Sequence, residues 1–138
     1  MSFKEQSGID IDQLIFGISQ ISQMLNVSPR QLRYWEKRGY IRSLAQKDGQ
    51  TRQYNAKAVV RIVGIKHFLD EGYTLAAAAD KVTKFAQQQK MLHDFVGQRF
   101  QGVTEIDGQP ELDFGHLADQ HLYGVMQQGR AEFKLRQD

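Results

Sequence analysis

The chain has 138 residues, of which 41% are hydrophobic and 25% are charged. This is enough for one modest core, or a small domain with an appendage, and it excludes a large multi-domain enzyme. Because the sequence contains no cysteine, it also excludes a disulfide framework, a thiolate nucleophile, a cysteine metal site and direct thiol redox sensing.

The start of the chain and the lack of a long apolar run bear on where the protein resides. No stretch approaches the roughly 20 apolar residues that cross a bilayer. The first residues, MSFKEQSG, lack the basic and apolar regions of a signal peptide. We therefore expect a cytoplasmic protein with no membrane partner.

The small net charge of +2 conceals a strong segregation of charge along the chain. Between Ser28 and Lys66, ten Lys and Arg residues stand against two acidic residues, a net of +8. From Phe100 onward, three basic residues stand against seven acidic ones, a net of −4. A charge run is usually only a solvated face. Here the basic block coincides with an aromatic-containing helix, which favours nucleic-acid binding.

The first predicted helix is short and follows a polar segment, residues 1 to 14, in which nothing fixes a structure. Ser19 can cap this helix, and Ile18, Ile21 and Leu25 share one of its faces. Asn26 is expected to end it in the left-handed conformation.

The second predicted helix is basic and carries its own start signal. Ser28 can cap it, Pro29 suits its first turn, and Gln31 stands where a capping-box partner belongs. Gly39 is expected to stop it. Helical spacing places Leu32 and Trp35 towards a core and a polar stripe on the opposite side, which consists of Arg30, Arg33, Tyr34 and Lys37. Helix, tight turn and capped basic helix form a helix-turn-helix pattern.

A basic wing is predicted after this helix. Ile41 and Arg42 form a short strand in this interpretation, Asp48-Gly49 supplies the hairpin turn, and Thr51 to Tyr54 return antiparallel.

Two longer helices follow the predicted wing. The first runs from Ala56 to about Glu71, capped by Asn55 and ended by Gly72. The second starts at Thr74, and its apolar residues follow a 3.5-residue rhythm. Packing within the chain and dimerisation both explain that stripe, and the sequence does not show whether the helix breaks near Gln87. The positions assigned to dimerisation are Leu75, Val82, Phe85, Leu92 and Val96.

Strand patterns replace helical ones after Gly97. Residues 100–106 and 111–114, joined at Asp107-Gly108, predict one hairpin, and residues 122–126 and 131–135 predict another. A few short strands with weak alternation cannot hold a core alone, so they should pack on the long helix or on a second chain.

Two stretches resemble the MerR family of bacterial transcription regulators. They are ISQISQMLNVSPRQLRYWEKRGYIRS and GQTRQYNAKAVVRIVGIKHFLDEGYTLAAAADKV, which contain the recognition helix, the wing exit T-R-Q-Y and the helix ending F-L-D-E-G-Y-T-L in the family's order. The similarity covers Ile18 to Val82. It implies a mainly α fold, in which a winged helix-turn-helix of four helices and a short β wing precedes a helix and a small β-hairpin-rich C-terminal region.

The resemblance also implies domains and site residues. The domains are an N-terminal arm (1–16), the DNA-binding domain (17–83), a helical dimerisation segment (84–99) and a β-rich effector or partner module (100–138). Tyr54 has a competing interpretation as a core residue, and Lys47 as a merely solvated lysine. The residues expected at double-stranded DNA are Arg30, Arg33, Tyr34, Lys37, Arg38, Lys47, Arg52, Tyr54 and Lys57.

The function implied is that of a homodimer bound to a near-palindromic operator, needing no cofactor. Such family dimers either block RNA polymerase or distort a promoter spacer so that polymerase engages it. The chain departs from the metal-responsive members because it lacks cysteine. Its C-terminal region is also much smaller than the ligand domain of the drug-responsive members, so the effector is unknown. The alternative is an architectural or excisionase-like DNA-binding protein.

An enzyme or metal site in the acidic C-terminal region is a third, disfavoured interpretation. His116 and His121 with Asp113 and Asp119 are ligand-type side chains, but a five-residue histidine spacing suits neither a helix face nor a strand face. His67 and His93 are expected to be ordinary helix residues. No phosphate-cradling glycine loop or Ser/His/Asp signature is present, so we expect neither a metal nor an enzyme.

Overall fold

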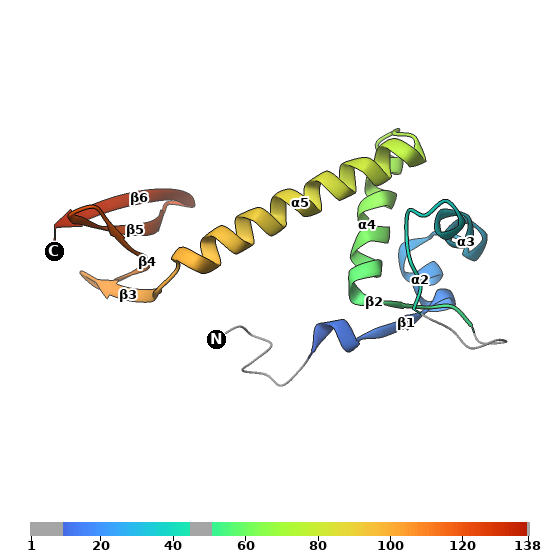
Figure 1. The fold of residues 1–138 in the computed structure, drawn as a ribbon, viewed down its shortest axis with the longest axis horizontal. Coiled ribbons are helices and arrows are strands. Elements are labelled where there is room, and N and C mark those ends of the chain that lie inside the picture. The colour runs from blue at the N-terminus through green and yellow to red at the C-terminus, as the bar shows by residue number, and fades with distance from the viewer. Residues whose placement is uncertain (1–9, 45–50, 138) are drawn as a thin grey trace. The chain divides into compact units, whose positions relative to one another are not determined.

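A computed structural model describes residues 10–44 and 51–137. The chain divides into two compact units, Met1–Phe85 and Ala86–Asp138, which we call the helical unit and the sheet unit. Most of the expected N-terminal arm, together with Lys47 and the Asp48-Gly49 turn, lies outside the described residues. The elements are η1 (Ile11–Gln13), β1 (Ile15–Gly17), α2 (Ile18–Leu25), α3 (Pro29–Lys37), β2 (Gln53–Asn55), α4 (Ala56–Asp70), α5 (Leu75–Arg99), β3 (Gly102–Ile106), β4 (Gln109–Leu117), β5 (Gln120–Gln127) and β6 (Arg130–Gln137) (Figure 1).

The start of α2 corrects the prediction that Ser19 caps this helix. Its N-cap is Gly17, and Gln20 Oε1 accepts a hydrogen bond from the Gly17 amide at 2.8 Å. The cap therefore lies two residues earlier, because the extended backbone of β1 leads directly into the helix. The other end agrees with the prediction, since Asn26 is left-handed at φ 54.

The local signals of α3 are confirmed. Ser28 Oγ accepts a hydrogen bond from the Gln31 amide at 3.1 Å, and Gln31 Oε1 accepts one from the Ser28 amide at 2.9 Å. Pro29 occupies the first turn. Gly39 follows the helix with φ +80, a conformation that most side chains disfavour. This capping box and this stop fix the helix within the helix-turn-helix.

The expected pairing of the wing strands is wrong. No strand forms at Ile41–Arg42, and Ile41 is instead buried in the core. β2 pairs antiparallel with β1, with Phe16 opposite Tyr54. Between the two arms of the predicted hairpin, the described residues make one backbone hydrogen bond, from the Leu44 amide to the Gln53 carbonyl at 2.8 Å. The predicted pairing does not form because Ile41 is buried in the core and β2 pairs with β1 instead.

The last two helices of the helical unit follow the sequence signals. The Asn55 side chain caps α4 by accepting from the Ala58 amide at 2.9 Å, and Gly72 follows the helix with φ +99. α5 continues without a break from Leu75 to Arg99. One apolar cluster holds together α2, α3, β2, α4 and α5. Its buried members are Ile18, Ile21, Val27, Leu32, Trp35, Ile41, Tyr54, Ile62, Ile65, Ala78, Ala79 and Val82.

The sheet unit shows that a mainly α description is only partly right. Beyond the end of α5 lies one four-stranded antiparallel sheet in the order β3-β4-β5-β6 (Figure 1). Both predicted hairpins form, and the turn at Ala118, with φ 57, joins them into a continuous meander. Within the described part of the chain, no helix is long and apolar enough to cross a membrane.

Candidate nucleic-acid interface

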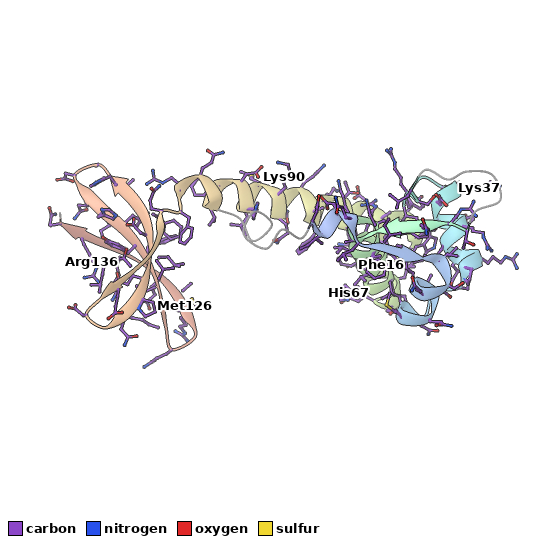
Figure 2. All side chains as sticks on the ribbon, turned by 90° about the horizontal axis from the view of Figure 1, so that it is seen from below. Phe16, Lys37, His67, Lys90, Met126 and Arg136 are labelled. Carbon is purple, nitrogen blue, oxygen red and sulfur yellow. The ribbon has the colours of Figure 1, made fainter. Side chains whose placement is uncertain are left out.

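The polar stripe of α3 lies on the surface of the helical unit. Leu32 and Trp35 are buried at 0% and 3% exposure and anchor the helix in the core. The opposite side carries the stripe expected from helical spacing, and Figure 2 shows Lys37 at its end. Its exposed members are Arg30, Arg33, Tyr34 and Lys37, followed by Arg38 at the C-cap. The helix therefore presents three Arg, one Lys and a tyrosine hydroxyl, groups that donate hydrogen bonds to phosphates and base edges.

Glu36 is the one acidic residue of α3, and its charge is matched inside the protein. Its Oε2 lies 2.7 Å from Arg52 Nε, and its Oε1 accepts hydrogen bonds from the amide and hydroxyl of Ser43. Burial alone would raise the pKa of Glu36, but the Ser43 hydrogen bonds and the Arg52 charge outweigh it and lower the pKa. Glu36 thus connects α3 to Ser43 and Arg52, which lie on either side of the predicted wing turn. Because its negative charge is paired with Arg52, it would repel an approaching phosphate less than an unpaired carboxylate would.

Arg52 and Tyr54 occupy different environments from the α3 stripe. Arg52 is 40% exposed at its side chain while it pairs with Glu36, so part of its guanidinium still faces solvent. Tyr54 has 0% exposure and lies in the core, which is where its competing interpretation places it. Burial raises the pKa of the Tyr54 hydroxyl, which has no hydrogen-bond partner among the described residues. In this conformation Tyr54 is a core residue and not a surface hydrogen-bond donor.

Lys57 lies in the first turn of α4, at the rim of a shallow hollow of about 380 Å³. Arg42 lines the same hollow and is exposed. Sequence reasoning counted Arg42 in the basic block but did not assign it to DNA. Its position in the sequence, between α3 and the predicted wing turn, could have indicated a place beside the other DNA-binding candidates. Arg42 and Lys57 add positive charge beside the N-terminus of α4, where the helix dipole favours anions.

Two cations of the basic block are paired with groups of the helical unit itself. Arg61 donates from Nε to the Tyr40 carbonyl, and its Nη1 donates to Thr83 Oγ1 at 3.0 Å. Burial lowers the pKa of Arg61. Lys66 Nζ lies 2.9 Å from Asp70 Oδ1, one turn along α4. The described cations of the block are therefore not all outward-facing, since Arg61 joins α4 to α5 and Lys66 pairs within α4.

The residues assigned to dimerisation fall into two groups along α5. Val82 is 9% exposed and contacts Gly64 of α4, and Leu75 packs against the core of the helical unit. Phe85, Leu92 and Val96 are 57%, 56% and 37% exposed. Packing within the chain thus accounts for the start of the apolar stripe, and the remaining positions stay open to a partner.

The C-terminal histidines form a local cluster on the sheet. His121 Nε2 lies 2.6 Å from Asp113 Oδ1, and the rings of His116 and His121 are 4.8 Å apart. The hydrogen bond to His121 is the main cause of the lowered pKa of Asp113. Among the described residues, no group of three or more His, Asp or Glu side chains is arranged to hold a metal.

Comparison with known proteins points to one family. The family model described as "MerR HTH family regulatory protein" matches residues 16–84, half of the chain. Among solved structures, the chain is similar to a MerR-family transcriptional regulator from Bacillus cereus, at 21% identity and TM-score 0.46, over 62% of this chain and 68% of that one. It is also similar to HiNmlR, a MerR family regulator lacking the sensor domain, solved bound to promoter DNA. That match has 15% identity and TM-score 0.42 and covers 62% of each chain. No curated protein matches the chain.

Proposed function

The chain belongs to the MerR family of helix-turn-helix regulatory proteins and has the fold of DNA-binding transcription regulators, and we propose that it acts as a homodimer on a near-palindromic operator. The observation that carries the proposal is α3, whose Leu32 and Trp35 are buried while Arg30 and Arg33 stay exposed. A helix held in this way presents its polar side as a rigid unit to the major groove.

The positions of the cations support two kinds of DNA contact, with base edges and with the phosphate backbone. Arg30 and Arg33 sit on the outward side of the recognition helix, from which guanine edges are read. Lys37 and Arg38 at its end, with Arg52 and Lys57 nearby, suit the phosphate backbone, which positions the protein without reading sequence. Lys47 is proposed for the same backbone role. Tyr54 supports this face from within the core.

Dimerisation is proposed through the exposed part of the α5 stripe. Leu92 and Val96 are one helical turn apart and both exposed, and with Phe85 they continue the 3.5-residue rhythm of a helix pair. A two-fold axis would place two α3 helices on half-sites about 34 Å apart, one turn of DNA. RNA polymerase would then be affected indirectly, at the promoter that contains the operator.

The test is to recover genomic DNA fragments that the purified full chain selects, and to map them. We expect inverted repeats within promoters, and we expect that altering one half-site weakens binding as much as altering the other. Fragments without inverted repeats would contradict a symmetric homodimer. Strongly bent sites outside promoters, without an effect on transcription, would instead support the architectural alternative.

A further inference from the structure

The four-stranded sheet has two chemically different faces. Cross-strand partners in a sheet share a face, and successive residues alternate between faces. The pairs Tyr123–Lys134 and His121–Arg136 lie on one face, and Gly124–Phe133 and Leu122–Leu135 lie on the other. Met126 and Arg136, labelled in Figure 2, therefore belong to opposite faces. We call the first the charged sheet face and the second the apolar sheet face.

The charged sheet face carries an internal ion pair between Glu111 and Arg136. Glu111 is 3% exposed, and both of its carboxylate oxygens accept hydrogen bonds from Arg136, at 2.5 and 3.2 Å. Arg136 also lies over the Tyr123 ring, 5.8 Å from its centroid. Ion-paired and solvated polar groups of this kind do not require a second protein layer packed against them.

The apolar sheet face is open. Phe114 packs against Phe100 and Phe133, with ring centroids 6.2 and 6.1 Å away, and it lies across Gly124, where an added Cβ would meet the ring at 2.8 Å. Along the strands of this face, the register leaves Glu105 on edge strand β3 as the one charged side chain. Phe133 and Met126 are 75% and 66% exposed. The other exposed members are Phe100, Val103, Leu112, Leu117 and Leu135.

The sheet unit buries too little apolar surface to stand alone. Val125 is the one buried hydrophobic residue among its described residues, whereas a sheet is stabilised by covering one hydrophobic face with another layer. We infer that the apolar sheet face packs against the same face of a second copy of this chain, so that two four-stranded sheets form one sandwich. The inference rests on the homodimer proposed above and adds a second contact to it.

The size and chemistry of the face favour a second copy as the occupant. Large side chains that each offer on the order of 100 Å² give this face roughly 600–700 Å², close to the ~800 Å² per partner of a standard interface. The face is nearly free of charge, so two copies meet without burying like charges.

The first test measures the dimer dissociation constant of the full chain by sedimentation across a concentration series. Phe133→Asp places one negative charge on the apolar sheet face, and Gln127→Asp places the same charge on the charged sheet face. We expect Phe133→Asp to raise the dissociation constant at least about tenfold, as an aromatic anchor would. Gln127→Asp should leave it within about twofold. Equal values for the two variants, or a wild-type chain that stays monomeric, would overturn the inference.

A third variant separates this inference from the proposed function. Leu92→Asp disrupts the exposed stripe of α5. If Leu92→Asp dissociates the dimer and Phe133→Asp does not, the homodimer stands and the sheet contact is overturned. If the wild type is monomeric, both are overturned.

Thiol labelling gives a second measurement that does not depend on tolerance of a charge. Because the chain has no cysteine, single Phe133→Cys and Glu132→Cys variants report opposite faces of β6, and both positions are exposed within one protomer. We expect the Phe133→Cys thiol to react with a maleimide at least about tenfold more slowly at dimeric concentrations, as a buried interface core requires. Equal rates in variants with unchanged far-UV circular dichroism would contradict the packing.

Discussion

The helical unit and the sheet unit have nearly opposite distributions of apolar surface. Among the described residues, the helical unit buries a cluster of twelve apolar side chains, from Ile18 to Val82, while the sheet unit buries Gly124, Val125 and the ion-paired Glu111. A buried cluster of this size supplies the main driving force for folding. The helical unit therefore has a hydrophobic core of its own, whereas the sheet unit leaves most of its large apolar side chains exposed.

Helix α5 contains the same contrast within one element. Ala78, Ala79 and Val82 are buried in the helical unit, and from Phe85 to Val96 no described residue of the helix is buried. The apolar residues at the start of α5 thus pack into the core of the helical unit, and those further along the same helix are exposed. The difference suggests that stability should depend on the first part of the helix and assembly on the second.

The largest expected effect is loss of the helical core by Leu32→Ala. Leu32 has 0% exposure on the inner side of α3, and truncation of such a residue costs about 3 kcal/mol through lost burial and a cavity. Unfolding in urea followed by Trp35 fluorescence measures this unit alone, because the chain has one tryptophan. Met24→Ala, at a side chain 56% exposed, is the control and should cost less than about 1 kcal/mol. Equal costs would mean that α3 is not anchored as described.

A smaller effect, on binding and not on folding, is expected for Arg33→Ala. Arg33 is exposed on the outward side of α3, so the folded state should be unchanged while operator affinity falls by about 1–3 kcal/mol. Fluorescence anisotropy with labelled operator measures the loss. The control is Arg130→Ala, which removes the same charge from an exposed position at the start of β6 in the sheet unit. A similar loss in both variants would indicate general electrostatics and not readout by α3.

These two residues belong to the part of the molecule that the sequence predicts well. The start of α3 depends on Ser28, Pro29 and Gln31, all within one helical turn, so local chemistry sufficed. The first hairpin of the sheet unit is predicted for the same reason, since Asp107-Gly108 signals a turn between nearby strands.

Features that depend on distant residues were missed. The pairing of β1 with β2 joins Phe16 to Tyr54, and no local pattern favours it over the wing hairpin. The ion pair of Glu36 with Arg52 and the structural use of Arg61 likewise depend on contacts between separate elements. The strand alternation of the sheet unit is interrupted by a register shift between Asp113 and His116, which obscured its two-faced character.

Two glycine-to-alanine substitutions test the contrast along α5, and we expect them to change the free energy of unfolding in opposite directions. An added Cβ at Gly64 of α4 would meet Val82 Cγ2 at 2.8 Å, so Gly64→Ala should destabilise the helical unit by about 1–2 kcal/mol through overpacking. Gly97, late in α5, has nothing within 4 Å of such a Cβ. Gly97→Ala should stabilise by about 0.5–1 kcal/mol, because alanine is the better helix former. Thermal melts of both variants provide the measurement, and destabilisation by Gly97→Ala would show that this part of α5 is tightly covered.

The smallest expected effect concerns the carboxylate that joins α3 to the segment around Ser43 and Arg52. Glu36→Gln should cost about 1 kcal/mol at neutral pH, because charge-assisted hydrogen bonds are weakened while the 40% exposed Arg52 side chain is screened by solvent. The folded-state pKa of Glu36 is lowered. Its contribution is therefore fully present above the unfolded-state pKa, near 4.5, and is lost as the pH falls through the lower folded-state value. Stability measured by Trp35 fluorescence should thus fall more steeply with acidification in the wild type than in Glu36→Gln. Parallel curves below that pH would mean that Glu36 is not paired in solution, and that Arg52 is as free for DNA as Arg33.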